Sequence, residues 1–176
     1  MTTQILVAGI GNIFMGDDAF GCEVAGDLAM RGMGEGVLVR DFGICSYDLA
    51  YAMTEGYEVV IMVDAVRRGE APGTVFLIEV SPSDIEQLAG PPDAHGMNPA
   101  TALQLAQALG GETQRLFVVG CEPAVLEADA IGLSDTVRNA VPEAIRMVEE
   151  LVQELTRESH PGNETPACAL PKSCGN

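Results

Sequence analysis

The sequence predicts a three-layer αβα sandwich, with a five-stranded, mostly parallel twisted sheet that contains one antiparallel strand. Three observations support this α/β class. Short apolar runs of strand length alternate along the chain with segments whose apolar residues recur at helical spacing. The length of 176 residues suits one domain that buries a core without disulfides. One connection between two strands is too short for a parallel crossover.

The first half of the chain supplies three strands and two helices. Gln4–Gly9 is an apolar run of strand length. Residues 18–31 then carry Phe20, Val24 and Leu28 at helical spacing, and glycines at positions 32, 34 and 36 end that helix. The next predicted elements are the strand Val37–Asp41, a short helix Tyr47–Thr54 capped by Ser46, and the almost wholly apolar strand Glu58–Ala65.

The fourth strand is predicted to run antiparallel to its neighbour. Thr74–Val80 follows the third strand after the loop Val66–Gly73, whereas a parallel crossover needs about a dozen residues or more. The later predicted elements are a helix from Ser81 to about Leu88, a helix Pro99–Leu109, a strand Arg115–Cys121 and a helix Ser134–Arg157. In the last helix Ser134 and Asp135 form the cap, and Pro142 is a candidate kink or break.

These elements define the predicted domain organisation. Residues 1–158 are expected to form a single α/β domain. The segment 159–176 has no apolar period and is expected to be a disordered tail.

The charge of the chain narrows the classes of partner. Nine Lys and Arg residues against 26 Asp and Glu residues give a net charge of −17, which repels nucleic acids and anionic membranes. Basic segments, metal cations or neutral surfaces are the expected partners. The sequence has no apolar run of bilayer length and no signal-peptide pattern, so a cytoplasmic location is expected. Five widely spaced cysteines without a CxxC pair predict reduced thiols.

Polar side chains from three segments are predicted to meet at the carboxyl edge of the sheet. Asp17 and Asp18 follow the first strand, and Asp64 closes the third strand, VVIMVDA. The loop that holds His95 precedes a helix that leads into a parallel strand, so this loop should lie above the same edge. A carboxylate closing an apolar strand is costly when unpaired, so Asp64 needs a cation or a donor nearby. Carboxylates with an imidazole suit a divalent first-row metal, with positions left for a substrate ligand or water.

Other interpretations of these residues stay open. Asp17 and Asp18 could serve only the helix dipole, and His95 could be an ordinary loop histidine. The GxGxxG fingerprint fails because Phe14 takes the third glycine position, yet Asp41 resembles a ribose-binding acid, so a dinucleotide-binding protein is one alternative. A thiol hydrolase that pairs Cys45 or Cys121 with His95 is another.

The ordered series of motifs resembles the hydrogenase maturation endopeptidases, a family that removes a C-terminal extension from the large subunit of nickel–iron hydrogenases. The resemblance spans about Ile5 to Leu155. The segments that carry it are ILVAGIGN from Ile5, GDDAFG from Gly16, VDA from Val63, APGT from Ala71, His95 in its loop, VVGCEP from Val118 and GLS from Gly132.

The resemblance implies an activity, a metal and a site. It implies a metal-dependent protease of a nickel–iron hydrogenase large-subunit precursor, acting after nickel insertion. The nickel is carried by the precursor and bound by Asp18, Asp64 and His95, which are the candidate catalytic and metal-binding residues; Asp17 would cap the helix or tune the local field. Many family members have a Gly-Gly-Thr-type turn where this chain has Asp41–Cys45. The resemblance therefore does not specify which large subunit this chain processes. The sequence does not specify the oligomeric state either. A non-proteolytic nickel- or precursor-binding chaperone using the same rim is the alternative.

Overall fold

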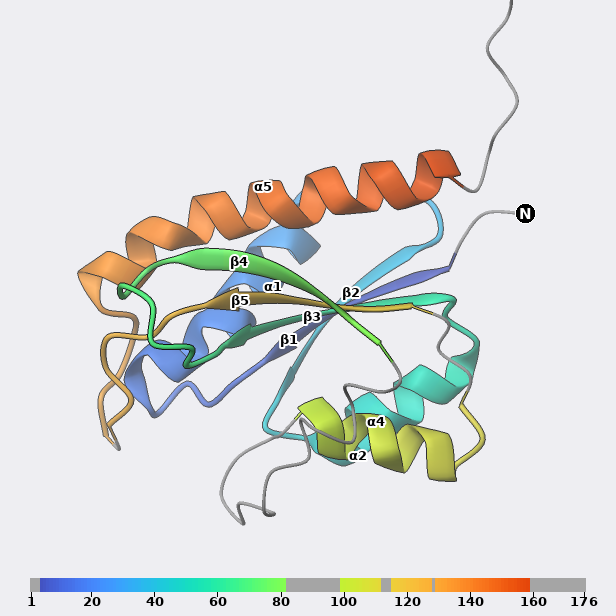
Figure 1. Cartoon of the computed structure of the whole chain (residues 1–176), viewed down its shortest axis with the longest axis horizontal. Coiled ribbons are helices and arrows are strands. Elements are labelled where there is room, and N and C mark those ends of the chain that lie inside the picture. The colour runs from blue at the N-terminus through green and yellow to red at the C-terminus, as the bar shows by residue number, and fades with distance from the viewer. Residues whose placement is uncertain (1–3, 82–98, 112–114, 128, 159–176) are drawn as a thin grey trace, which may run out of the picture.

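A five-stranded sheet forms the centre of the molecule, as the computed structural model shows for residues 4–81, 99–111, 115–127 and 129–158 (Figure 1). The strand order is β2-β1-β3-β5-β4. Strands β1, β2, β3 and β5 are parallel, and β4 is antiparallel to β5. The bounds are Ile5–Ile10 for β1, Val37–Gly43 for β2, Val59–Ala65 for β3, Val75–Val80 for β4 and Arg115–Cys121 for β5. The predicted fold class is therefore confirmed.

Helices cover both faces of this sheet (Figure 1). On one face lie α1 (Phe20–Arg31) and α5 (Asp135–Glu158), and on the other lie α2 (Ser46–Ala52) and α4 (Pro99–Ala108). Two 3-10 turns, η1 (Gly16–Ala19) and η2 (Met53–Glu55), adjoin α1 and α2. Within the described residues, every helix is too short or too polar to cross a bilayer.

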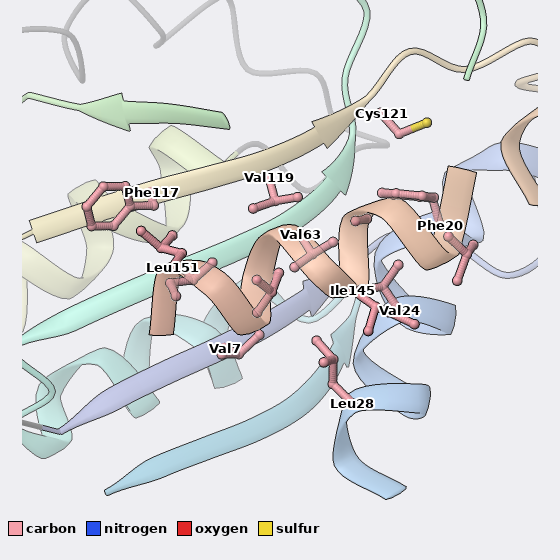
Figure 2. Packing of buried hydrophobic residues seen from close by; sticks show 14 of the residues in the cluster. Val7, Phe20, Val24, Leu28, Val63, Phe117, Val119, Cys121, Ile145 and Leu151 are labelled. Atoms are coloured by element: carbon pink, nitrogen blue, oxygen red, sulfur yellow. The ribbon is translucent and has the colours of Figure 1, made fainter. Parts of the chain in front are cut away.

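The core has two halves, one on each face of the sheet. Figure 2 shows Val7, Val63 and Val119 pointing from neighbouring strands toward α1 and α5. The alternate residues of the same strands, such as Leu6 and Met62, pack against α2 and α4. Because side chains alternate along a strand, a sheet covered on both faces needs the nearly continuous apolar runs seen in β1, β3 and β5.

Strand β4 runs antiparallel, as predicted, and its neighbour is β5 rather than β3. The connection from β3 therefore passes over the end of β5, where Glu122 holds it. The buried Glu122 carboxylate accepts hydrogen bonds from the backbone N–H groups of Arg68, at 2.7 Å, and Glu70, at 3.2 Å. The backbone of Glu122 also bonds to that of Gly73 and Thr74. A short loop can thus cross one strand because a buried carboxylate satisfies its amides.

The predicted cap residue is correct for α5 and wrong for α2. The Ser134 Oγ accepts the N–H of Val137 at 3.4 Å, so the predicted cap of α5 is confirmed, and α5 continues through Pro142 without a break. The predicted Ser46 cap is wrong. The N–H of Leu49 already donates to the carbonyl of Cys45, which makes Cys45 the cap residue and Ser46 the first residue of α2. The predicted helix from Ser81 to about Leu88 and the tail 159–176 lie outside the described residues.

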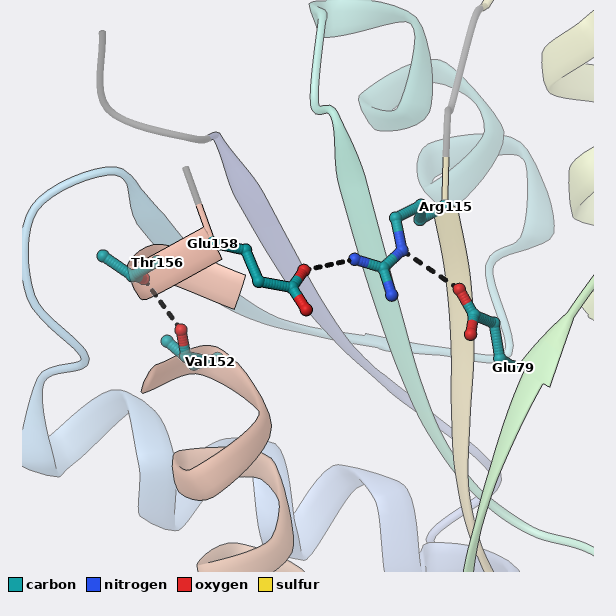
Figure 3. A network of polar contacts seen from close by, with 5 residues as sticks. All are labelled: Glu79, Arg115, Val152, Thr156 and Glu158. Atoms are coloured by element: carbon teal, nitrogen blue, oxygen red, sulfur yellow. Dashed lines mark hydrogen bonds and ion pairs between the residues drawn. The ribbon is translucent and has the colours of Figure 1, made fainter. Parts of the chain in front are cut away.

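An arginine at the start of β5 ties the amino-terminal edge of the sheet together (Figure 3). The Arg115 Nε lies 3.0 Å from a Glu79 carboxylate oxygen on β4, and its Nη1 lies 2.8 Å from one of Glu158 at the end of α5. This ion-pair network is exposed and lies at the edge opposite the carboxyl ends of the parallel strands, so it belongs to the scaffold.

Candidate active site

Glycines shape the turn that brings Asp18 to the end of β1. Gly11 has a φ of +141°, and a Cβ added there would clash with the carbonyl of Asp18. A Cβ on Gly21 would clash with the carbonyls of Ile10 and Val63, so α1 can approach the sheet only with glycine at this position. Gly9 and Gly11, the two glycines that fit the GxGxxG fingerprint, therefore serve close contacts within this chain. Asp41, the candidate ribose-binding acid, accepts the N–H of Gly43 in its own turn at 2.8 Å.

Asp18 is half-buried at this turn. Its Oδ2 accepts the backbone N–H of Asn12 at 2.8 Å, which engages one of the two carboxylate oxygens. Burial raises the pKa of Asp18, and the hydrogen bond from Asn12 offsets part of that effect. Asp18 is therefore anchored by one oxygen in a setting that disfavours a lone negative charge.

Asp64 lies at the end of β3, beside β1, and is only 7% exposed. Burial raises the pKa of Asp64 well above its ordinary value, the charge of Asp18 raises it further, and a hydrogen bond from the N–H of Ala65 lowers it in part. The η1 turn, which holds Asp18, packs against β3, which holds Asp64, so two carboxylates from separate segments lie near each other at the carboxyl edge of the sheet. A cation between them would offset both the burial and the repulsion.

The third predicted residue cannot be placed beside this pair, because His95 lies outside the described residues. Among the residues that are described, there is no group of three or more His, Cys, Asp or Glu side chains arranged to hold a metal. Two carboxylates alone can bind a cation that another molecule supplies, or hold a proton and orient a water. The metal-binding role of Asp18, Asp64 and His95 thus stays a prediction.

Asp17 binds a different part of the chain from Asp18 and is fully buried. Its Oδ2 accepts the N–H groups of Ala124, at 2.8 Å, and Val125, at 2.7 Å, and the hydroxyl of Ser134, at 3.0 Å. Its Oδ1 accepts the N–H of Ser134 at 2.7 Å. Burial alone would raise the pKa of Asp17, but these hydrogen bonds outweigh it and lower the pKa below the ordinary value. The prediction that Asp17 caps its own helix is wrong, because its carboxylate binds residues 124–125 and Ser134, at the start of α5, instead.

A buried thiol lies behind the two site carboxylates. The Cys22 Sγ donates to the carbonyl of Gly11 at 3.4 Å. Burial, then the nearby Asp41 carboxylate, then the charges of Asp18 and Asp64 raise the pKa of Cys22 to about 12. The closeness of Cys22 to Asp18 could have been predicted from the sequence, since Cys22 is four residues after Asp18 and a helical turn brings such positions together.

The surroundings of Cys121 argue against its use as the nucleophile of a thiol hydrolase. This side chain is fully buried on β5. Burial raises the pKa of Cys121 to about 12, and the charges of Asp17, Glu122 and Glu143 contribute. A catalytic cysteine needs a lowered pKa and access to its substrate, so Cys121 has the surroundings of an inert thiol.

Comparisons with known proteins agree on one family. A family described as "Hydrogenase maturation protease" matches residues 22–151. The chain is 34% identical over 149 residues to a provisionally named hydrogenase maturation protease of Methanocaldococcus jannaschii, covering 82% of this chain and 94% of that protein. It is 29% identical over 161 residues to the hydrogenase 2 maturation protease of Escherichia coli, covering 90% and 96%. The structure of the hydrogenase maturating endopeptidase HybD from E. coli superposes with a TM-score of 0.75 at 27% identity, covering 86% of this chain and 93% of that one.

Proposed function

The chain belongs to the hydrogenase maturation protease family, and we propose that it is the endopeptidase that removes the C-terminal extension of a nickel–iron hydrogenase large-subunit precursor after nickel insertion. The observation that supports this proposal is the packing of η1, which holds Asp18, against β3, which holds the buried Asp64, at the carboxyl edge of the sheet. Open α/β sheets bind their ligands at this edge. The nickel is part of the substrate, and Asp18, Asp64 and His95 are the residues that recognise it.

The electrostatics of the pair support recognition of a metal rather than of a neutral peptide. Asp64 is buried beside a second carboxylate, so its ionised form is disfavoured until a cation arrives. A precursor without nickel brings no such cation at this point and would bind weakly. This dependence explains how cleavage would follow nickel insertion.

Hydrolysis then requires water to add to the carbonyl carbon of the scissile peptide bond, and the leaving amine to take up a proton. The nickel of the precursor would polarise the carbonyl, and one of the two carboxylates can take the proton of the water and pass it to the leaving amine. Asp18 is suited to act from the rim, since one of its oxygens is held by Asn12. The buried Asp64 supplies charge at the floor of the site.

The experiment is to incubate nickel-loaded precursor with the wild-type chain and with Asp18→Asn, Asp64→Asn and His95→Ala, and to measure the mass of the precursor. Each variant is expected to lose cleavage, because each removes one candidate nickel ligand. Asp48→Asn, an exposed acid on α2, is the matched control and should cleave normally. Unimpaired cleavage by the three site variants would refute the assignment. Tight precursor binding by the wild-type chain without a change in mass would favour the chaperone alternative.

A further inference from the structure

Three exposed apolar side chains gather on two adjacent loops next to Asp18. Ile13 is 52% exposed and Phe14 is 62% exposed, both in the loop from β1 to η1. Ile131 is 84% exposed in the segment between β5 and α5. These three residues are called the Phe14 patch below. Neighbouring exposed apolar side chains of this kind often mark an interaction site.

Hydrogen bonds hold the two loops together. The Phe14 N–H donates to the Asn12 side chain at 3.0 Å, and the Phe14 carbonyl accepts the N–H of Asp129 at 3.0 Å. The next residues continue the contact, since Met15 pairs with Ala130 in a parallel bridge and the N–H of Gly16 donates to the carbonyl of Ala130 at 2.6 Å. The patch is therefore ordered before a partner arrives, which lowers the entropic cost of binding.

The surroundings of the patch are negatively charged. Residues 11–19 and 124–134 contain no Lys or Arg, whereas Asp18, Glu127 and Asp129 lie in them beside the buried Asp17. Arg138 on α5 reaches the same segment, where its Nη2 donates to the Leu133 carbonyl at 2.8 Å, so acidic groups outnumber this cation around the patch. An apolar surface inside such a field suits a partner segment that combines apolar side chains with positive charge. It disfavours an acidic segment of similar hydrophobicity.

The patch is also continuous with the candidate active site. Asn12 links the two, because its backbone N–H binds Asp18 and its side chain binds the N–H of Phe14. Resting on the proposed function, we propose that the Phe14 patch is the docking surface for an apolar, positively charged segment of the nickel-carrying precursor. Docking there places the polypeptide next to the carboxylates that recognise its nickel.

The test is the cleavage kinetics of the nickel-loaded large-subunit precursor made by the same organism. Phe14→Ser is expected to raise KM by about tenfold or more with kcat nearly unchanged, because a docking contact acts equally on bound substrate and transition state. Met30→Ser, an 81% exposed apolar side chain on α1, is the matched control and should leave both constants unchanged. The double variant Glu127→Gln, Asp129→Asn should weaken the dependence of KM on salt, and Glu154→Gln on α5 should not.

The outcomes separate the docking proposal from the proposed function. Normal KM for Phe14→Ser, with active wild-type protein, would overturn the docking surface and leave the protease assignment standing. Absence of cleavage by the wild-type chain would overturn the protease assignment, and the docking proposal with it. If sedimentation showed that the wild-type chain self-associates and Phe14→Ser does not, the patch would be an interface between two copies, and the precursor proposal would be overturned.

Discussion

Replacing Asp17 with asparagine should destabilise the fold, whereas the same change at the adjacent Asp18 should not. The Asp17 carboxylate is fully buried and accepts three backbone N–H groups and the hydroxyl of Ser134. In Asp17→Asn the amide oxygen can take over the bonds to Ala124, Val125 and the Ser134 hydroxyl. The amide NH₂ then faces the N–H of Ser134, so that donor loses its acceptor.

The size of the effect follows from these contacts. An unsatisfied buried donor costs about 1–3 kcal/mol, and hydrogen bonds to a neutral acceptor are roughly half as strong as those to a carboxylate. Together these losses lower the free energy of unfolding by about 2–4 kcal/mol. For a domain of this size the melting temperature should fall by about 5–15 °C.

Urea denaturation and thermal unfolding of both variants are the assays. Asp18→Asn keeps an oxygen to accept the N–H of Asn12 and removes a charge that repels Asp64, so its free energy of unfolding should change by less than about 1 kcal/mol. A decrease in the free energy of unfolding of less than about 1 kcal/mol for Asp17→Asn, or equal decreases for the two variants, would refute the conclusion that the Asp17 carboxylate stabilises the contact between η1 and α5.

Three further predictions follow from the packing. Gly21→Ala should lower the free energy of unfolding by about 3 kcal/mol or more, because the new Cβ would clash with the backbone of the sheet. Gly26→Ala, on the same helix, places its Cβ in open space and should raise the free energy of unfolding by up to about 1 kcal/mol. Chemical denaturation measures both changes. Cys22 and Cys121 are buried, and each has a pKa raised to about 12, so both thiols stay protonated at pH 8 and should resist iodoacetamide until the chain is unfolded. Peptide mass spectrometry detects the labelling, and a label on either cysteine in the native protein would contradict its burial. Arg115→Met should cost less than about 1 kcal/mol and less still at high salt, since both of its ion pairs are exposed, and a larger loss in urea denaturation would contradict a surface role.

Much of the fold could be predicted from the sequence because its strands are apolar and its turns are marked by glycine. The strand Arg115–Cys121 has the predicted bounds, and the other strands differ by one or two residues at their ends. The position of β4 could not be predicted in the same way. Loop length fixes its direction, but its pairing with β5 depends on contacts far apart in the chain and on the crossing held by Glu122.

The candidate site was predictable in part. Topology places Asp18 and Asp64 at one edge, because Asp18 follows β1, Asp64 lies at the end of β3, and these parallel strands are neighbours. Sequence alone could not separate the roles of Asp17 and Asp18, since the η1 turn, rather than residue type, points one carboxylate inward and the other to the rim. Glu122 resembles Asp64 in being a carboxylate at the end of an apolar strand, so its buried role could have been inferred from the sequence. His95 stays a prediction from sequence.

The most direct test of the central claim is the mass of the hydrogenase large subunit in cells that lack this chain. We expect a nickel-containing large subunit that retains its C-terminal extension, and a return to the mature mass when the wild-type chain, but not Asp64→Asn, is supplied. A large subunit of mature mass in cells without this chain, where no other protease of the family is present, would contradict the proposed function.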